Sequence, residues 1–379
     1  MSNKNLLVIS INDPTDIKSF SGISYHACKA LESHYVVEIV FISAIPFWVR
    51  MYGKIMNRVF SNRYRLKNST LYSWVLSKQI QKQLKKKQKQ YEYLLFFNCV
   101  QLLAHFDKTV CPKSKIVYYS DSTFQLGLDY YPALTNLSNF NIKEGHTIDS
   151  KAYNNADLIL LSSEWAASSV VNYYNVEPSK VKVLKYGANL PDLSYRKRIF
   201  EKQISLLIVG VEWKRKGINI AIEVHKRLLE MGYASQLTII GLKQYPAEIH
   251  SIQNLFLHTF INKGSTEGTM QLKKEFENAN YFLFPTLADC TPIVLAESMM
   301  FGLPIIARNT GGLSSMVENE VNGFLIDETG TVDDFINALL KIHVAGVYER
   351  FSENSRHLYE TQFNWDVWLT KFKDHVASI

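Results

Sequence analysis

The chain has 379 residues, of which 47% are hydrophobic, 20% charged and 13% aromatic. This length favours two domains, and the apolar content excludes a disordered chain, a fibre and a coiled coil. The four cysteines form no CxxC pair, so we expect no zinc site and no disulfide framework, and we infer a reducing, cytoplasmic compartment. The apolar run at the N-terminus is too short for a signal peptide, and no apolar run approaches the roughly 20 residues that a membrane-spanning helix needs.

Short apolar runs alternate with amphipathic helical patterns along the whole chain. The runs are almost continuously apolar, which is typical of strands buried in a parallel sheet. A first series comprises residues 6–10, 36–42, 93–97, 116–119, 158–161 and 181–184. A second series comprises residues 205–209, 237–240, 255–260, 281–284, 304–307 and 323–326. The sequence therefore predicts an α/β fold with two parallel sheets.

A segment without clear periodicity separates the two series. Residues 186–203 contain Gly187, Pro191 and a run of basic residues, a composition typical of a linker. We therefore predict an N-terminal domain over residues 1–190 and a C-terminal domain over residues 191–359. The end of the chain, about residues 360–379, has aromatic residues at near-helical spacing. It predicts a closing helix that packs on one of the two domains, with the N-terminal domain as the candidate.

The net charge of +7 is unevenly distributed. Residues 1–190 carry 23 basic and 13 acidic side chains, whereas residues 191–379 carry 19 and 22. Between Arg50 and Gln90 there are twelve Lys or Arg residues, interleaved with aromatic residues, and no Asp or Glu. This composition predicts that residues 47–90 contact an anionic membrane surface. A solvated helix face and a nucleic-acid surface are the alternatives, but no nucleic-acid recognition motif accompanies the segment, and we expect no nucleic-acid partner.

Two carboxylates mark the candidate site of the second half. A strand ends near Pro285, a polar loop carries Asp289, and a helix is expected to start near Pro292, with Thr291 as its cap and the proline at the first helical position. Such a helix start offers backbone N–H groups to an anion. Glu297 lies too far along the helix to cap it, so we expect it to accept hydrogen bonds from ligand hydroxyls. The alternative is a pair of solvated carboxylates near a helix start.

Several other chemistries lack their motifs. The chain has no HExxH, no GxxxxGK[ST], no GxSxG and no GxGxxG after a strand. Metal-dependent hydrolysis, P-loop phosphate transfer, nucleophilic hydrolysis and dinucleotide redox chemistry therefore have no support. Cys290 lacks a histidine nearby in the sequence, and we interpret it as a small neighbour of the Asp289 loop rather than as a nucleophile.

The spacing of these residues resembles that of a known family. An acidic residue, seven residues and a Glu are followed by Gly302-Leu303-Pro304 and Gly311-Gly312. Further matching segments occur in the same order, namely Ser21-Gly22, Tyr119-Ser120-Asp121-Ser122, Ser162-Ser163-Glu164-Trp165-Ala166, Tyr186-Gly187-Ala188-Asn189 and Arg215-Lys216-Gly217. This set resembles the nucleotide-sugar site of glycosyltransferase family 4, which comprises retaining enzymes of the GT-B fold. The resemblance implies two Rossmann-like domains that face each other across a cleft.

The resemblance implies roles for residues of the second domain. Glu297 would bind the ribose of the donor, and Asp289, which stands where the family usually has Glu, would face the donor sugar. The backbone at Thr291, Ile293 and Val294 would meet the diphosphate, and Lys216 with Arg215 would neutralise it. A cation there is chemically sensible, because the leaving nucleoside diphosphate gains negative charge in the transition state. The alternative for Lys216 is an ordinary basic residue before a helix.

In the first domain the resemblance points to Gly22 and Asp121. Gly22 would let the backbone approach the diphosphate or the acceptor, since glycine tolerates unusual backbone angles. Asp121 follows a predicted strand, where open α/β sheets bind ligands, and would contact the acceptor hydroxyl or the donor sugar; a helix cap is the alternative.

Together these features predict a retaining glycosyltransferase that moves a sugar from a nucleotide diphosphate sugar to an acceptor hydroxyl. The acceptor would be a glycan or a lipid-linked glycan in bacterial-type surface polysaccharide or glycolipid assembly, at the cytoplasmic face of the membrane. We expect no cofactor and no metal requirement. The alternatives are a nonenzymatic nucleotide-sugar-binding protein and another GT-B enzyme, such as a nucleotide-sugar epimerase or a phosphorylase.

Overall fold

The computed structural model describes residues 4–87, 89–192 and 195–379. Residues 1–3 and 193–194, which fall within the predicted domains, and Gln88 of the basic segment lie outside the described residues. The described chain divides into two compact units, unit 1 with Met1–Lys185 and Trp368–Ile379, and unit 2 with Tyr186–Val367. The chain thus enters unit 2 at residue 186 and returns to unit 1 at residue 368, where the sequence suggested residue 191 and about residue 360.

Unit 1 is built on a parallel sheet. In the described residues its strands are β1 (Asn5–Ser10), β2 (Val36–Phe41), β3 (Tyr93–Phe97), β4 (Lys115–Ser120), β5 (Leu158–Leu161) and β6 (Val181–Val183). They are arranged in the order β2-β1-β3-β4-β5-β6, and neighbouring strands run parallel. The sequence predicted every one of these strands as buried, but β2 and β6 are largely part-exposed because they lie at the two edges of the sheet.

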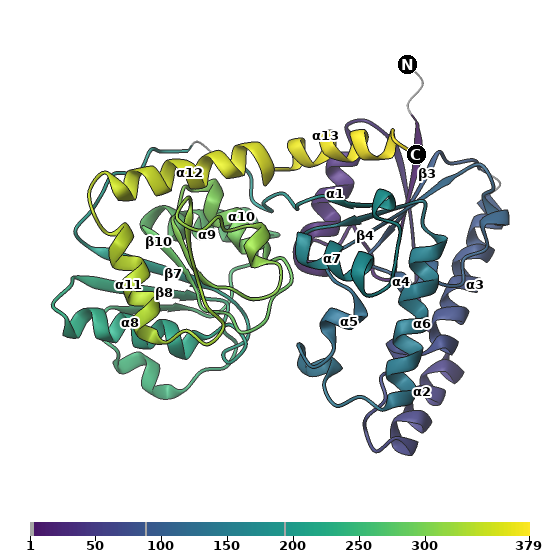
Figure 1. Ribbon diagram of the computed structural model, residues 1–379, viewed down its shortest axis with the longest axis horizontal. Helices are drawn as coiled ribbons and strands as arrows, with labels where there is room; N and C mark the ends of the chain where they lie inside the picture. Colours follow the sequence, from purple (N-terminus) through teal and green to yellow (C-terminus); the bar gives the residue numbers. More distant parts are fainter. Residues whose placement is uncertain (1–3, 88, 193–194) are drawn as a thin grey trace. The chain divides into compact units, whose positions relative to one another are not determined.

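The helices of unit 1 cover this sheet (Figure 1). They are α1 (Ile23–Glu32), α2 (Phe47–Val59), α3 (Thr70–Lys87), α4 (Val100–Leu103), α5 (Phe124–Gly127), α6 (Asn139–Asn155) and α7 (Glu164–Asn172). The last helix of the chain, α13 (Trp365–Val376), belongs to this unit from Trp368 onward. Trp368 is fully buried, stacks on Phe372 and donates its indole N–H to the hydroxyl of Tyr119 at 2.9 Å. The aromatic spacing near the C-terminus therefore belongs to a core helix.

Unit 2 repeats the parallel arrangement. Its described strands are β7 (Ile204–Val209), β8 (Ser235–Ile240), β9 (Leu255–His258), β10 (Tyr281–Phe284), β11 (Ile305–Arg308) and β12 (Gly323–Ile326), in the order β12-β11-β10-β7-β8-β9. Its helices are α8 (Ile218–Glu230), α9 (Thr266–Asn278), α10 (Ile293–Met300), α11 (Val332–Ile342) and α12 (Val347–Gln362). Arg198 of the predicted linker donates to the carbonyl oxygens of Phe276 and Phe301, at 2.7 and 2.5 Å, and so fastens that segment to unit 2.

The strand order decides which loops of unit 2 meet. From β7 the chain proceeds outward to β8 and β9, and it then crosses back to build β10, β11 and β12 on the other side. Because all the strands are parallel, their carboxyl ends lie at one edge of the sheet. The loops after β7 and β10 start side by side there, at the topological switch point where open α/β sheets bind ligands.

Candidate functional site

The loop that follows β7 presents two basic residues. Lys216 lies just before α8, which begins after Gly217 in the left-handed conformation, with φ +66°. A Cβ atom at Gly217 would lie 2.1 Å from the carbonyl oxygen of Pro285, and one at Gly210 would lie 2.6 Å from Cγ of Lys216. Only glycine at these two positions lets the loop pack against the end of β10 and lets the stem of Lys216 lie against the end of β7.

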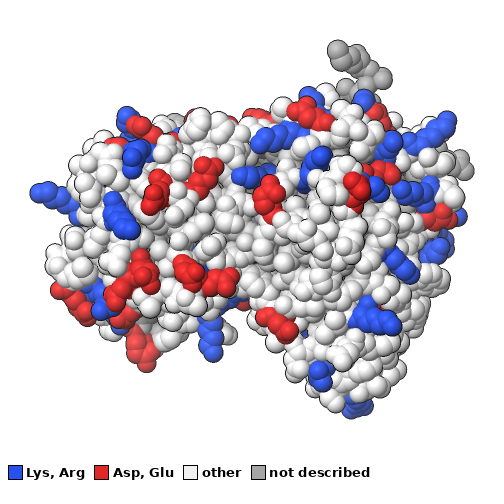
Figure 2. All heavy atoms as spheres, in the orientation of Figure 1, with Lys and Arg blue, Asp and Glu red and all other residues white. Residues whose placement is uncertain are grey.

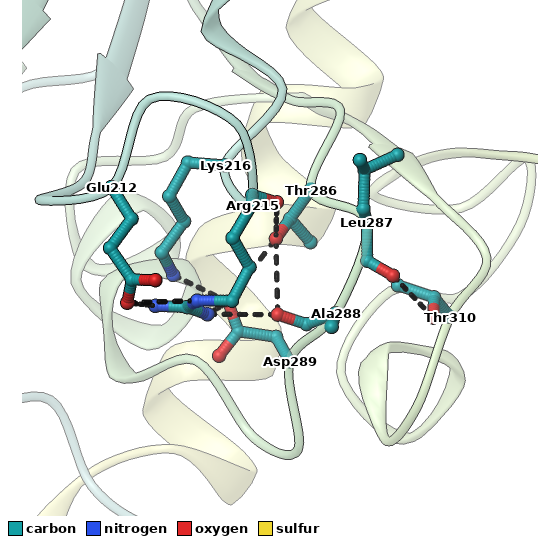
Figure 3. Close-up of polar contacts among 8 residues, drawn as sticks. All are labelled: Glu212, Arg215, Lys216, Thr286, Leu287, Ala288, Asp289 and Thr310. Carbon is teal, nitrogen blue, oxygen red and sulfur yellow. Dashed lines mark hydrogen bonds and ion pairs between the residues drawn. The ribbon is translucent and has the colours of Figure 1, made fainter. Parts of the chain in front are cut away.

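Asp289, in the loop after β10, pairs with both basic residues (Figure 3). Lys216 Nζ lies 2.5 Å from Asp289 Oδ2, and Arg215 Nη1 lies 3.4 Å from the same oxygen. Arg215 also donates to the carbonyl oxygen of Ala288 at 2.8 Å, while its own carbonyl accepts the N–H of Leu287 at 2.7 Å. The structure therefore brings Lys216, Arg215 and Asp289 together, and the two loops are tied by backbone as well as by charge.

The charges of this cluster are sheltered from water. The side chains of Lys216 and Asp289 are only 10% and 14% exposed. Burial lowers the pKa of Lys216, and the neighbouring carboxylate of Asp289 opposes that shift. Hydrogen bonds from Arg215 lower the pKa of Glu212, which closes the cluster on its exposed side. The charges of these four side chains sum to zero, so an arriving anion must compete with Asp289 for Lys216.

Glu297 lies deeper, on the buried helix α10. Its side chain is 0% exposed, and its two carboxylate oxygens accept hydrogen bonds from Lys263 Nζ at 2.5 and 2.7 Å. The alternative of two solvated carboxylates is therefore wrong, both for Glu297 and for Asp289. Sequence reasoning missed Lys263, although its place after the third strand of the second series put it at the same sheet edge.

The start of α10 differs from the expectation by one residue. The helix begins at Ile293, and Pro292 occupies the N-cap position with extended angles, φ −71° and ψ 111°. The prediction of a Thr291 cap with proline at the first helical position is therefore wrong. Thr291, Ile293 and Val294 are all buried. Because the side chains of Ile293 and Val294 are apolar, any contact of these two residues with an anion would use their backbone N–H groups.

Gly22 of unit 1 ends a segment of unusual backbone geometry. It precedes α1 with φ 82°, and the two residues before it, Phe20 and Ser21, also have positive φ values of 48° and 55°. Such angles are costly for residues other than glycine, and they cluster at ligand-binding and catalytic sites. This geometry marks the loop after β1 as a candidate part of the site.

Asp121 follows β4 directly, as the sequence predicted. It is not a helix cap, because Thr123 caps α5 by accepting the N–H of Leu126 at 3.2 Å. Next to it on the sheet edge, Ser120 donates to Asn98 Oδ1 at 3.0 Å, and Asn98 has a positive φ of 49°. Sequence reasoning also missed Asn98, whose position directly after β3 was the available signal.

Within the described ranges, no group of His, Cys, Asp and Glu side chains is arranged to hold a metal ion. Nor does any helix in the described part of the chain combine the length and the apolar character that crossing a bilayer requires.

Two Rossmann-like parallel sheets, the second with a charged carboxyl edge at its switch point, define the GT-B architecture, and solved structures confirm this fold class. The chain superposes on sucrose-phosphate synthase from Thermosynechococcus elongatus with a TM-score of 0.69, at 14% identity and over 99% of both chains. It superposes on Anabaena Alr3699/HepE, solved in complex with UDP and glucose, with a TM-score of 0.64, at 12% identity and over 100% of both chains.

A family model and curated relatives match parts of the chain. Residues 192–358 match the family model described as "Glycosyl transferases group 1", and this range contains Lys216, Lys263, Asp289 and Glu297. The chain is also 27% identical over 237 residues to the Escherichia coli UDP-Gal:alpha-D-GlcNAc-diphosphoundecaprenol alpha-1,3-galactosyltransferase, an alignment that covers 57% of this chain and 59% of the relative. The chain spans about half the length of the curated relatives it matches.

Proposed function

We propose that the chain is a retaining glycosyltransferase of family 4 that transfers a sugar from a nucleotide diphosphate sugar to an acceptor hydroxyl. The family match of unit 2 and the names of the relatives support transferase activity. The observation that carries the proposal is the buried cluster of Lys216, Arg215 and Asp289 at the switch point, together with the fully buried Glu297.

The chemistry of the cluster suits a diphosphate leaving group. The bond between the anomeric carbon and the diphosphate oxygen breaks, and its electron pair stays on the diphosphate. Lys216 and Arg215 then face a growing negative charge in a place sheltered from water, where a fixed cation is effective. Asp289 holds the ammonium of Lys216 in position before the donor arrives, and it faces the donor sugar once the diphosphate has taken its place.

Retention follows from attack on the face that the diphosphate leaves. The acceptor oxygen forms a bond with the anomeric carbon on that face, and its proton passes to the departing phosphate oxygen. No metal is needed in this scheme, because basic side chains and backbone N–H groups balance the charge. In unit 1, Gly22 is the proposed contact of the diphosphate or the acceptor, and Asp121 that of the acceptor hydroxyl or the donor sugar.

The donor experiment starts from a panel of nucleotide sugars. UDP-sugars head the panel, since the Escherichia coli relative and the Anabaena neighbour are named with UDP-Gal and UDP; GDP- and ADP-sugars complete it. We expect one member to raise the melting temperature and to be hydrolysed slowly to its nucleoside diphosphate, with retained configuration of the released sugar by NMR. Binding without turnover would favour a nonenzymatic nucleotide-sugar-binding protein, and inversion would contradict the retaining assignment.

We also propose that unit 1 docks peripherally on an anionic membrane, where lipid-linked acceptors in polysaccharide or glycolipid assembly are presented at the cytoplasmic face. Helix α2 supports this proposal. Phe47, Met51, Ile55 and Val59 recur every fourth residue on one exposed stripe, and three of them are between 57% and 69% exposed. The opposite side of the helix, which carries Val49 and Gly53, is buried. A helix with an exposed apolar stripe is typical of membrane-surface binding.

Cations flank the exposed apolar stripe of α2. Arg50, Lys54 and Arg58 are exposed and also recur every fourth residue, so they form a second stripe beside the first. Figure 2 shows Lys and Arg side chains with few Asp or Glu over the end of unit 1 where Figure 1 places α2. The far end of the basic segment differs, because Lys87 and Lys89 pair with Glu38.

Cosedimentation with vesicles tests the docking. The wild type should pellet with phosphatidylglycerol vesicles at low salt, and the binding should weaken as the Debye length falls from about 30 Å at 0.01 M to about 8 Å at 0.15 M. The double variant Phe47→Ser, Ile55→Ser should lose this binding and keep nucleotide binding. Met231→Ser, an exposed apolar residue of unit 2, is the matched control. A wild type that stays in the supernatant at low salt would identify α2 as a solvated face.

A further inference from the structure

The buried carboxylate of Glu297 needs a compensating charge, and its own helix, α10, does not provide one. A carboxylate with no exposed surface is costly unless it is paired and hydrogen-bonded, and α10 is buried along its whole length. Lys263 supplies the compensation, since its ammonium reaches one lone pair on each carboxylate oxygen. A carboxylate has about four acceptor positions, so Glu297 retains acceptor capacity on both oxygens for further donors.

Hydrogen bonds and close packing fix the backbone around Lys263. Its carbonyl oxygen accepts the hydroxyl of Thr269 at 3.1 Å, and the preceding carbonyl, of Asn262, accepts the N–H of Ser265 at 3.2 Å. Ser265 caps α9 by accepting the N–H of Gly268 at 3.1 Å, and a Cβ atom at Gly268 would lie 2.0 Å from the Asn262 oxygen. The start of α9 thus holds Lys263 at the carboxyl end of β9.

The ammonium of Lys263 lies between protein and solvent. Its side chain is 28% exposed, whereas that of its partner Glu297 is not exposed at all. Because the ammonium is partly exposed and the carboxylate is not, Lys263 lies on the solvent side of Glu297. A ligand that approaches the free acceptor positions of the carboxylate from solvent would pass the ammonium and share Glu297 with it.

We propose that Lys263 is a positioning residue of the donor site: its ammonium holds the carboxylate of Glu297 and orients the free lone pairs of that carboxylate toward the two ribose hydroxyls of the nucleotide. The inference rests on the proposed function, because it assumes that Glu297 faces the ribose. It assigns a role to a residue 34 positions before Glu297 in the sequence, which acts on the nucleotide through the carboxylate.

The role has a chemical signature. Without the ammonium, the buried carboxylate is an uncompensated charge, and it relieves that cost by taking up a proton. A protonated carboxyl group accepts fewer hydrogen bonds, so ribose recognition should then weaken as the pH falls. A purely structural lysine would instead weaken binding of every nucleotide to the same extent and at every pH.

The test uses the tightest binder among UDP, GDP and ADP and its 2′,3′-dideoxy analogue, measured by calorimetry. Lys263→Met should weaken binding of the ribonucleotide by about tenfold or more, as expected for the loss of well-oriented hydrogen bonds to a charged group. Binding of the dideoxy analogue should change less than about twofold, since it lacks the hydroxyls concerned. Lys263→Arg should restore most of the affinity, and Lys274→Met, an exposed lysine on α9, should leave it unchanged.

The pH dependence completes the experiment. Between pH 8 and pH 6 the ribonucleotide affinity of Lys263→Met should fall more steeply than that of the wild type. Lys263→Gln, which keeps a donor but no charge, should behave in the same way and serves if the methionine variant does not fold. Equal losses for the ribose and dideoxy nucleotides, or wild-type affinity in both variants, would overturn the role of Lys263. Failure of all three nucleotides to bind the wild type would overturn the proposed function itself.

Discussion

Replacement of Lys216 by methionine separates charge from packing at the candidate site. The methionine keeps an unbranched side chain that packs against Gly210, where the lysine side chain leaves no room for a Cβ atom. It also lies near the ring of Phe284, whose centroid is 4.8 Å from the ammonium of Lys216. It removes the charge that pairs with Asp289 at 2.5 Å. Arg215 remains as a partner of Asp289, so the variant should fold.

The magnitude follows from where the charge changes during the reaction. Two unit charges about 4 Å apart interact by about 4 kcal/mol at the effective dielectric of about 20 that suits sheltered sites. When the donor binds, Lys216 gives up its ion pair with Asp289 and pairs with the diphosphate instead. Because one anion replaces another, Lys216 contributes little to the free energy of donor binding in the ground state. The additional charge on the leaving diphosphate meets no such competition. We therefore expect kcat to fall about 100- to 1000-fold, with a change in KM below about tenfold.

The assay is hydrolysis of the nucleotide sugar selected by the thermal-shift panel, with water as the acceptor and release of the nucleoside diphosphate as the signal. Lys214→Met is the control, because Lys214 lies in the same loop and is exposed. It should leave both kinetic constants unchanged. An increase in KM alone for Lys216→Met would contradict this role, since it would mean that Lys216 binds the ground state and the transition state equally well.

Two further predictions concern stability. Burial raises the pKa of Asp149 to about 6, although Phe124 N–H and the Tyr153 hydroxyl donate to its carboxylate. Because the folded pKa lies above the unfolded value of about 3.9, its contribution to the free energy of unfolding should fall by about 2 to 3 kcal/mol as the pH rises from about 4 through 6. In urea unfolding, the free energy of unfolding of Asp149→Asn should therefore rise relative to that of the wild type over this pH range. An equal difference between the two free energies at pH 4.5 and at pH 7.5 would contradict this. Gly217→Ala, which forces a Cβ atom against the Pro285 carbonyl, should lower the free energy of unfolding by about 1 to 3 kcal/mol, and wild-type stability would disprove the tight packing of the two loops.

The strands were predictable because burial in parallel sheets leaves a continuous apolar signature in the sequence. The observed strands coincide with the predicted runs to within one or two residues at most ends. The exposure of β2, β6 and β9 was not predictable in the same way, because strand order, rather than composition, decides which strands lie at an edge. The exposed stripe of α2 has a similar origin. The sequence showed the aromatic and basic residues, but which side of the helix packs depends on the rest of unit 1.

The residues of the candidate site also differ in how far the sequence alone could predict them. Asp289, Glu297 and Lys216 stood out because their local spacing resembles a known family, and the structure places Lys216 against Asp289. Lys263 carried no local signal, since its partner Glu297 is far away in the sequence and the pair forms only when β9 and α10 reach the same sheet edge. The start of α10 was misjudged because the ring of proline fixes φ at about −65° at either position, and only the observed ψ of 111° places Pro292 at the N-cap rather than at the first helical position.

We propose that unit 2 holds a nucleoside diphosphate with its ribose at Glu297, and calorimetry measures this binding directly. UDP, GDP and ADP are titrated into the wild type, into Glu297→Ala and into Lys274→Met as the control. We expect one of them to bind the wild type and the control, and Glu297→Ala to weaken its binding by about 1.5 to 3 kcal/mol, or about 10- to 150-fold in Kd. Equal affinity in the wild type and Glu297→Ala, or no binding of any of the three, would contradict it.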